Sequence, residues 1–248
     1  MDWLPPFLIP MSEVAPVTLG PADVPRWLFW AVAGPTAAGW VVTYLLAIRQ
    51  AIVDKRVGVP VYMAAVDFAW EFSLTFILEQ TPTQRGINFA WVIVNVFLMY
   101  QVFRYGRNDY PRLSPRAFTW SVLGVLVWAA LLVMAGANEF HDLDGMYIGM
   151  VINVPLSASF ILMLRRRGSS LGQSMHIATA KCVGSFFAGL TGFLLYPHRI
   201  LFWVVVPTMV VLDIVYLVLL HRTMRAEGRS PWAFTARPHA EAVLVART

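Results

Sequence analysis

The sequence predicts an all-α, polytopic membrane protein that folds as a bundle of seven transmembrane helices. Hydrophobic residues make up 58% of the 248 positions, and charged residues only 13%. Soluble domains carry roughly 25% charged residues, about twice this share. The mean hydropathy is +0.62, and the apolar residues gather in runs of about 20, the length that a helix needs to cross a bilayer.

Seven such runs divide the chain. We expect residues 1–26, which contain six prolines, to form an extracytoplasmic lead, because prolines so close together leave no room for a long helix. Residues 27–222 should form the seven-helix transmembrane domain, and residues 223–248 a cytoplasmic tail. The predicted spans are residues 27–48, 57–78, 87–105, 117–136, 145–164, 174–196 and 200–220.

The basic residues predict the orientation of the spans. Fifteen lysines and arginines lie in the loops after spans one, three and five, at the adjoining span ends and in the tail. The other ends hold three, which are Arg26, Arg85 and Arg199. Because basic residues stay on the cytoplasmic side, the amino terminus should lie outside and the carboxyl terminus inside. The same pattern explains the high pI without a nucleic-acid partner.

The source of the chain is indicated by composition alone. Arginines outnumber lysines 17 to 2, which is typical of GC-rich bacterial genomes. We therefore expect a multi-pass protein of a bacterial plasma membrane, with the lipid bilayer as its surroundings.

The second span carries two acids where lipid-facing side chains would be expected. Asp67 and Glu71 are four residues apart in M-A-A-V-D-F-A-W-E-F-S-L-T-F-I, so they share one face of a helix. Each acid costs about 2.5–3.5 kcal/mol on the membrane-insertion scale. A chain that keeps both is expected to use them or to pair them inside the bundle.

Further polar side chains lie at similar depth in other spans. Lys181 lies in span six, Asp213 in span seven, and Asn95 and Asn153 in spans three and five. Lipid solvates none of them, so we expect all of them to face a shared cavity. The structural alternative is a set of ties between helices, with Lys181 neutralising Asp213 and the asparagines bonding across helices.

Three buried acids face one lysine, so at least one acid should remain un-ionised. Two carboxylates about 6 Å apart repel each other by roughly 3 kcal/mol at an effective dielectric constant of 20. An un-ionised carboxylic acid in a dry apolar pocket can donate a proton. Aromatic side chains nearby, including Phe68, Trp70, Trp91 and Tyr216, either fill space or stabilise a carbocation with their ring faces.

The sequence resembles a known family at several short motifs. They are D-F-A-W-E at 67–71, I-N-V-P-L-S at 152–157, G-Q-S at 172–174, K-C-V-G at 181–184 and L-D-I-V-Y at 212–216. The family is that of the small seven-span integral-membrane terpene cyclases of meroterpenoid and indole-terpenoid pathways, the paxilline- and pyripyropene-type group with its bacterial relatives. The likeness covers almost the whole chain.

The resemblance implies a reaction of secondary metabolism. Members of the family protonate a terminal alkene or epoxide of a prenyl chain attached to an aromatic or indole group, and the polyene then cyclises. Glu71 and Asp213 would be the catalytic acids, with Asp67 as the companion of Glu71. Trp70, Asn95, Asn153, Lys181, Phe68, Trp91 and Tyr216 would bind the substrate. No cofactor or metal is expected.

The sequence lacks the motifs of several other enzyme classes. The sequence has no D-D-x-x-D for ionising a diphosphate with magnesium, and no H-E-x-x-H, P-loop or dinucleotide-binding fingerprint. A proton-coupled secondary transporter with three, one and three helices is the main alternative, because Pro35 and Pro155 fall in corresponding spans. A retinal protein usually carries its lysine in the last span, and here that span has none.

Overall fold

The computed structural model describes residues 23–142, 144–197 and 199–234. The expected lead therefore lies almost wholly outside the described residues, as does the end of the tail. Within these ranges the chain forms seven α-helices and one short 3₁₀ helix. They are α1 (Arg26–Asp54), α2 (Val61–Phe76), α3 (Pro82–Tyr105), η3 (Gly106–Asp109), α4 (Pro115–Phe140), α5 (Met146–Arg167), α6 (Met175–Leu195) and α7 (Ile200–Ala226).

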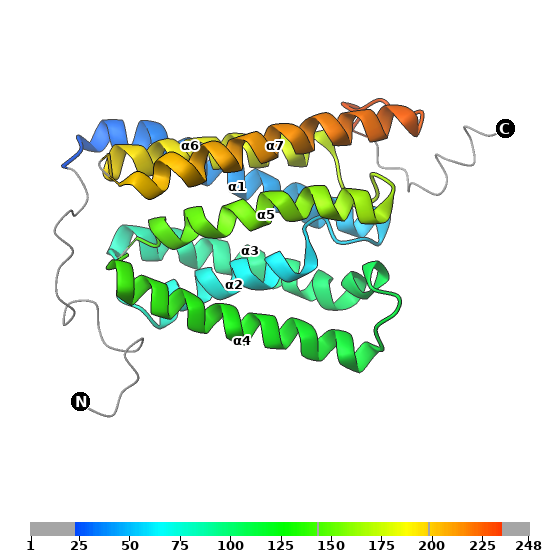
Figure 1. Ribbon diagram of the computed structural model, residues 1–248, viewed down its shortest axis with the longest axis horizontal. Helices are drawn as coiled ribbons and strands as arrows, with labels where there is room; N and C mark the ends of the chain where they lie inside the picture. Colours follow the sequence, from blue (N-terminus) through cyan, green and yellow to red (C-terminus); the bar gives the residue numbers. More distant parts are fainter. Residues whose placement is uncertain (1–22, 143, 198, 235–248) are drawn as a thin grey trace.

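The helices lie roughly parallel to one long axis, with α6 and α7 along one edge and α4 along the other (Figure 1). α1 packs against α6 and α3, and α2 packs against α3, α4 and α5. We name the end at which α1, α3, α5 and α7 begin the outer end, and the opposite end the inner end, after the predicted orientation. α1 begins at one end of the bundle and α7 finishes at the other (Figure 1).

Six of the seven helices are long and apolar enough to cross a membrane, which confirms the polytopic all-α fold. The exception among the described helices is α2. It has 16 residues, so it spans about 24 Å, less than the ~30 Å of a bilayer core. The predicted second span, 57–78, is therefore only partly helical.

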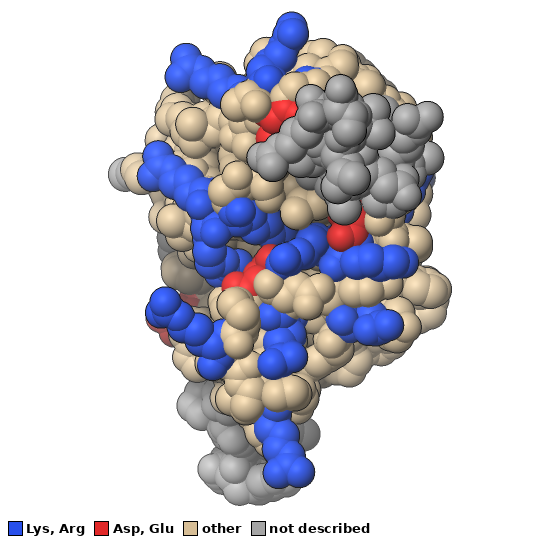
Figure 2. Space-filling view, turned by 90° about the vertical axis from the view of Figure 1, so that its right-hand side faces the viewer, with Lys and Arg blue, Asp and Glu red and all other residues tan. Residues whose placement is uncertain are grey.

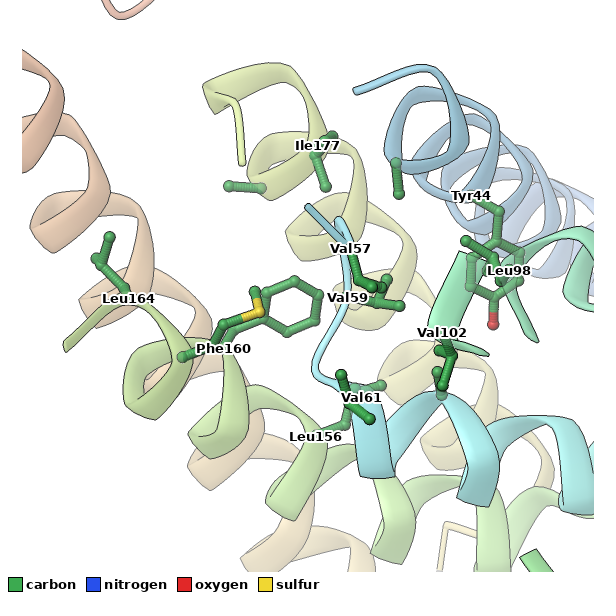
Figure 3. Packing of buried hydrophobic residues seen from close by; sticks show 14 of the residues in the cluster. Tyr44, Val57, Val59, Val61, Leu98, Val102, Leu156, Phe160, Leu164 and Ile177 are labelled. Atoms are coloured by element: carbon green, nitrogen blue, oxygen red, sulfur yellow. The ribbon is translucent and has the colours of Figure 1, made fainter. Parts of the chain in front are cut away.

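The missing part of the second span is a non-helical segment inside the protein, residues 57–60, with bends at residues 58 and 59. Pro60 is the N-cap of α2 in an extended conformation, and residues 57–60 before it are all buried. Figure 3 shows Val57 and Val59 between helices, near Leu98 and Phe160. Non-helical backbone is tolerated at membrane depth only where protein covers it, and this packing supplies the cover.

Local sequence signals explain where the other helices begin and end. Thr81, Ser114 and Ser174 cap α3, α4 and α6 by accepting backbone N–H hydrogen bonds. α5 lies between two glycines with positive φ, Gly145 at 67° and Gly168 at 60°, a conformation that glycine adopts without a steric penalty. α1 and α7 each extend six residues beyond their predicted spans, to Asp54 and Ala226.

Candidate active site

A cavity of about 360 Å³ lies inside the bundle, between α1, α2, α3, α5 and α6. Arg26 in the first turn of α1 and Tyr44 in its interior both line it. Those two residues are 18 positions apart, or about 27 Å along a helix. The cavity is therefore elongated, and it extends from the outer end of the bundle towards its middle.

The two acids of α2 lie on the wall of this cavity at its deep end. Their spacing of one helical turn places both on the same face, as the sequence predicts. The Tyr44 hydroxyl donates a hydrogen bond to Oδ2 of Asp67. Glu71 is only 1% exposed, and its Oε2 has no hydrogen-bond partner among the described residues. The two acids thus differ: Asp67 is held by a phenol, and Glu71 is not.

Three further residues of the predicted site line the same cavity. Trp70 and Trp91 present their rings to it, with centroids 6.4 Å apart. Asn153 of α5 uses its Nδ2 to bond the Gly149 carbonyl oxygen at 2.9 Å. Its Oδ1, like the Trp70 indole N–H, finds no partner within the described chain. One acceptor and one donor on residues that line the cavity are therefore unsatisfied.

Asn95 lies beside the acids but in a separate, much smaller hollow, which Tyr44 and Asp67 also line. It is completely buried, and its side chain interacts with both acids of α2. The shared cavity therefore does not extend to Asn95.

Lys181 and Asp213 pair with each other instead of lining the cavity. The Lys181 Nζ lies 2.5 Å from Asp213 Oδ1 and donates a second hydrogen bond to Ser157 Oγ at 2.7 Å. Neither side chain is more than 2% exposed. This is the interhelical tie that the sequence offered as the structural alternative. Lys181 lies 5.7 Å from the ring of Trp40, which does line the cavity.

Phe68 and Tyr216, two of the predicted substrate-binding residues, also do not line the cavity. Phe68 stacks on Phe72 with ring centroids 5.9 Å apart. Tyr216 is buried in the main core and donates a hydrogen bond to Gln173 at 2.7 Å. These contacts hold the two side chains away from the cavity.

The sequence offered no role for several residues that shape the cavity. Tyr44 and Trp40 are one turn apart on α1 and both line the cavity. An aromatic pair in the middle of a span was the only sequence feature that could have indicated this. At the outer end, Thr81 Oγ1 donates to Asp144 Oδ1 at 2.9 Å and ties two turns of the chain together. Gly149 leaves room for the Trp70 ring, since a Cβ at Gly149 would lie 3.3 Å from it.

The comparisons with known proteins agree with this architecture. Residues 21–226 match the family model of the Pyr4-like transmembrane terpene cyclases. The chain belongs to this family. It is thus a multi-pass membrane protein of a terpene cyclase family.

Three similar proteins carry terpene cyclase names. Terpene cyclase pyr4 of Aspergillus fumigatus is 26% identical over 212 residues, which cover 77% of this chain and 85% of that protein. Terpene cyclase olcD of Penicillium canescens is 29% identical, with 62% and 65% covered. Pyr4-family terpene cyclase mfmH of Annulohypoxylon moriforme is 27% identical, with 61% and 64% covered. The chain therefore spans slightly less than two thirds of the last two proteins.

No solved structure matches this chain. The family match gives no support to the transporter alternative. The three relatives named here are fungal, so the bacterial source remains a prediction from composition.

Proposed function

We propose that this membrane terpene cyclase starts its reaction by protonating a terminal alkene or epoxide of a prenyl chain attached to an aromatic or indole group. The observation that carries the proposal is Glu71, a buried carboxyl group with an unpartnered oxygen on the wall of a largely apolar cavity. General acids need this combination of access to the substrate and exclusion of water.

The different surroundings of the two acids support their different roles. A hydrogen-bond donor stabilises a carboxylate, so Asp67, which accepts from Tyr44, is the acid that holds the negative charge. Its charge, one turn away, keeps the proton on Glu71. Asp67 is therefore the companion that prepares Glu71 to donate.

Glu71 can both donate the first proton and accept the last one, so the enzyme returns to its starting state. Transfer of the Glu71 proton to the alkene or epoxide leaves a carboxylate and starts the cation cascade. Loss of a proton from the final carbocation then restores the acid, if Glu71 itself accepts that proton. The rings of Trp70 and Trp91 lie on the cavity wall, where their faces can stabilise the cationic intermediates.

The shape of the cavity supports one orientation of the substrate. The acids lie at the deep end, so the reacting end of the prenyl chain enters first. The aromatic or indole group then remains nearer the outer end, where Arg26, Thr81 and Asp144 line the cavity. The Trp70 N–H and the Asn153 Oδ1 are unpartnered on residues that line the cavity, and in this proposal a small shift of either side chain lets it bond an oxygen or N–H group of the substrate.

Asp213 has a structural role, unlike Glu71. Because Lys181 holds it outside the cavity lining, we assign it to positioning α5, α6 and α7 around the site and not to proton donation. The arginine-rich composition supports the plasma membrane of a bacterium as the location.

The proposal is tested by supplying the expressed protein with a panel of prenylated indoles and phenols, each with and without a terminal epoxide. The expected product is a cyclic isomer with the same mass as its substrate. Glu71→Gln membranes are the matched control and should form it about 10²–10⁴-fold more slowly. Unchanged conversion by Glu71→Gln, or no isomer from the panel with correctly inserted protein, would overturn the proposal.

A further inference from the structure

A second hollow, of about 520 Å³, lies at the inner end of the bundle, far from the acids of α2. Its walls come from the residues after α1, from η3 and the loop that follows it, and from the end of α5. Figure 2 shows the inner end face-on, with many lysine and arginine side chains across it. The hollow therefore opens where the membrane-spanning helices reach the bilayer surface.

The charges around this inner hollow do not balance. Four arginines line it, Arg56, Arg112, Arg166 and Arg167, against one acid, Asp109. Four positive charges and one negative charge leave an excess of three. Retention of loops on the cytoplasmic side explains why arginines occur at this end, but not why four of them surround a hollow.

One side of the hollow is fixed by internal hydrogen bonds. The Arg167 side chain is 4% exposed and lies 2.5 Å from Asp109 Oδ2. It also donates to the carbonyl oxygens of Val57 at 2.9 Å and Leu171 at 2.7 Å. Arg56 bonds Asp109 Oδ1 at 3.0 Å. Asp109 is thus already engaged by two arginines, and the wall exists before any ligand arrives.

The other two arginines remain open to a ligand. The guanidinium of Arg166 is 42% exposed and reaches Asp109 only at 4.0 Å, and it lies 4.2 Å from the centre of the Tyr110 ring. Arg112 is exposed, and the described part of the chain gives it no hydrogen-bond or ion-pair partner. Two accessible guanidinium groups therefore line a preformed basic hollow.

We propose that this inner hollow binds the phosphate group of an anionic membrane lipid, with Arg112 and Arg166 as the main contacts. The planar guanidinium group matches phosphate oxygens in a two-pronged geometry. Basic hollows between helix ends on the cytoplasmic side suit anionic headgroups. Pro111, Leu113 and Leu171 add apolar surface to the same walls, which suits the glycerol and first acyl carbons of a lipid better than free phosphate. This inference does not depend on the reaction proposed above.

The test measures lipid retained by the full-length protein, with native mass spectrometry after mixing with phosphatidylglycerol and phosphatidylcholine. Wild type should retain one phosphatidylglycerol in preference to phosphatidylcholine. Arg112→Gln and Arg166→Gln should each weaken that binding about fivefold, the effect of one basic residue near an anionic headgroup. Arg225→Gln is the matched control, because Arg225 is exposed at the inner end of α7 but does not line the hollow.

Inorganic phosphate separates the two sources of the ligand. Millimolar phosphate should not displace the retained phosphatidylglycerol. Equal retention of the two lipids, equal effects of Arg112→Gln and Arg225→Gln, or binding of phosphate without binding of the lipid would each overturn the proposal.

Discussion

The ammonium nitrogen of Lys181 lies 2.5 Å from a carboxylate oxygen of Asp213, and both side chains are buried where α6 and α7 face α5. Ser157 of α5 accepts a second hydrogen bond from the same nitrogen. The three groups therefore join three helices. An ion pair in such a place is neutral as a unit, whereas either partner alone would be a buried uncompensated charge.

Removing one partner should therefore damage the protein more than removing both. Asp213→Asn and Lys181→Met should each cost about 3–5 kcal/mol in the free energy of unfolding, because a lone buried charge remains. The double variant should regain most of this stability. Thermal unfolding of the three variants in the same detergent measures the difference.

Cyclisation by the double variant separates positioning from proton transfer. Recovery of activity together with stability is the expected result. A double variant that folds like wild type but forms no product would contradict the positioning role and return Asp213 to the catalytic acids.

Glu71 should have a larger effect on catalysis than its neighbours. Glu71→Gln removes the donated proton but keeps the shape, so turnover should fall by about 10²–10⁴-fold without loss of the fold. Tyr44→Phe removes the hydrogen bond to Asp67 and should cause a smaller fall. Glu79→Gln is the matched control, because Glu79 is exposed beyond the end of α2. Product formation by Glu71→Gln close to the wild-type rate would show that another group starts the reaction.

A bulky side chain in the cavity should block the reaction without touching an acid. Ala37 lines the cavity, whereas the next residue, Ala38, is exposed on the outer surface of α1. Ala37→Phe should lower product formation at least tenfold, because its ring occupies the path between Arg26 and Tyr44. Ala38→Phe adds the same ring on the lipid side and should leave turnover unchanged. If the two variants lose activity equally, the substrate does not occupy this cavity.

The sequence predicts the depth of a polar side chain in the membrane better than it predicts which neighbouring helix that side chain faces. The spacing of Asp67 and Glu71 places both on one face of α2 from sequence alone, and the cavity lies on that face. Asp213 lies at a suitable depth, but depth does not tell which neighbours the side chain meets, and Lys181 holds it outside the cavity.

Two features depend on contacts between distant parts of the chain and were not predicted. Tyr44 meets Asp67 across 23 residues, and no local pattern announces such a pair. The non-helical segment at residues 57–60 has an apolar sequence that predicts a helix. It is stable without helical hydrogen bonds because neighbouring helices cover it. Hydropathy detects burial but not the backbone conformation of a buried segment.

Asp142, in the turn between α4 and α5, should make stability depend on pH. Its side chain is fully buried, and Oδ2 accepts a hydrogen bond from the Ile148 N–H at 3.0 Å. Burial raises the pKa of this carboxyl from 3.8 to about 6, although backbone N–H groups act in the opposite direction. The folded state thus binds a proton more tightly than the unfolded state does.

The sign of the effect follows from this difference. The stabilisation is complete below pH 3.8 and is lost as the pH rises to about 6, a change of about 3 kcal/mol. Asp142→Asn keeps an acceptor without the titration, so its unfolding midpoint should fall less than that of wild type between these pH values. Glu79→Gln retains Asp142 and should retain the fall. Parallel curves for wild type and Asp142→Asn would contradict the assignment.

The close packing of Gly39 in α1 against Gly184 in α6 should control both stability and the position of Tyr44. A methyl group added at Gly39 would lie 2.7 Å from the Cα of Gly184, whereas one added at Gly34 meets nothing within 4 Å. Both glycines lie in α1, and alanine favours a helix over glycine by roughly 0.5–1 kcal/mol. Gly34→Ala should therefore be neutral or slightly stabilising. Gly39→Ala should destabilise by about 1–3 kcal/mol, since backbone atoms of α6 cannot turn aside as a side chain can.

The same pair of variants tests whether helix packing positions the acid site. Tyr44 lies five residues after Gly39 and bonds Asp67 on α2, so moving α1 away from α6 changes the geometry around the acids. Gly39→Ala should lose turnover even at temperatures where it remains folded, and Gly34→Ala should not. Product assays below the unfolding midpoint of each variant make the comparison. Full activity in a folded Gly39→Ala protein would show that the Tyr44–Asp67 contact tolerates this movement of α1.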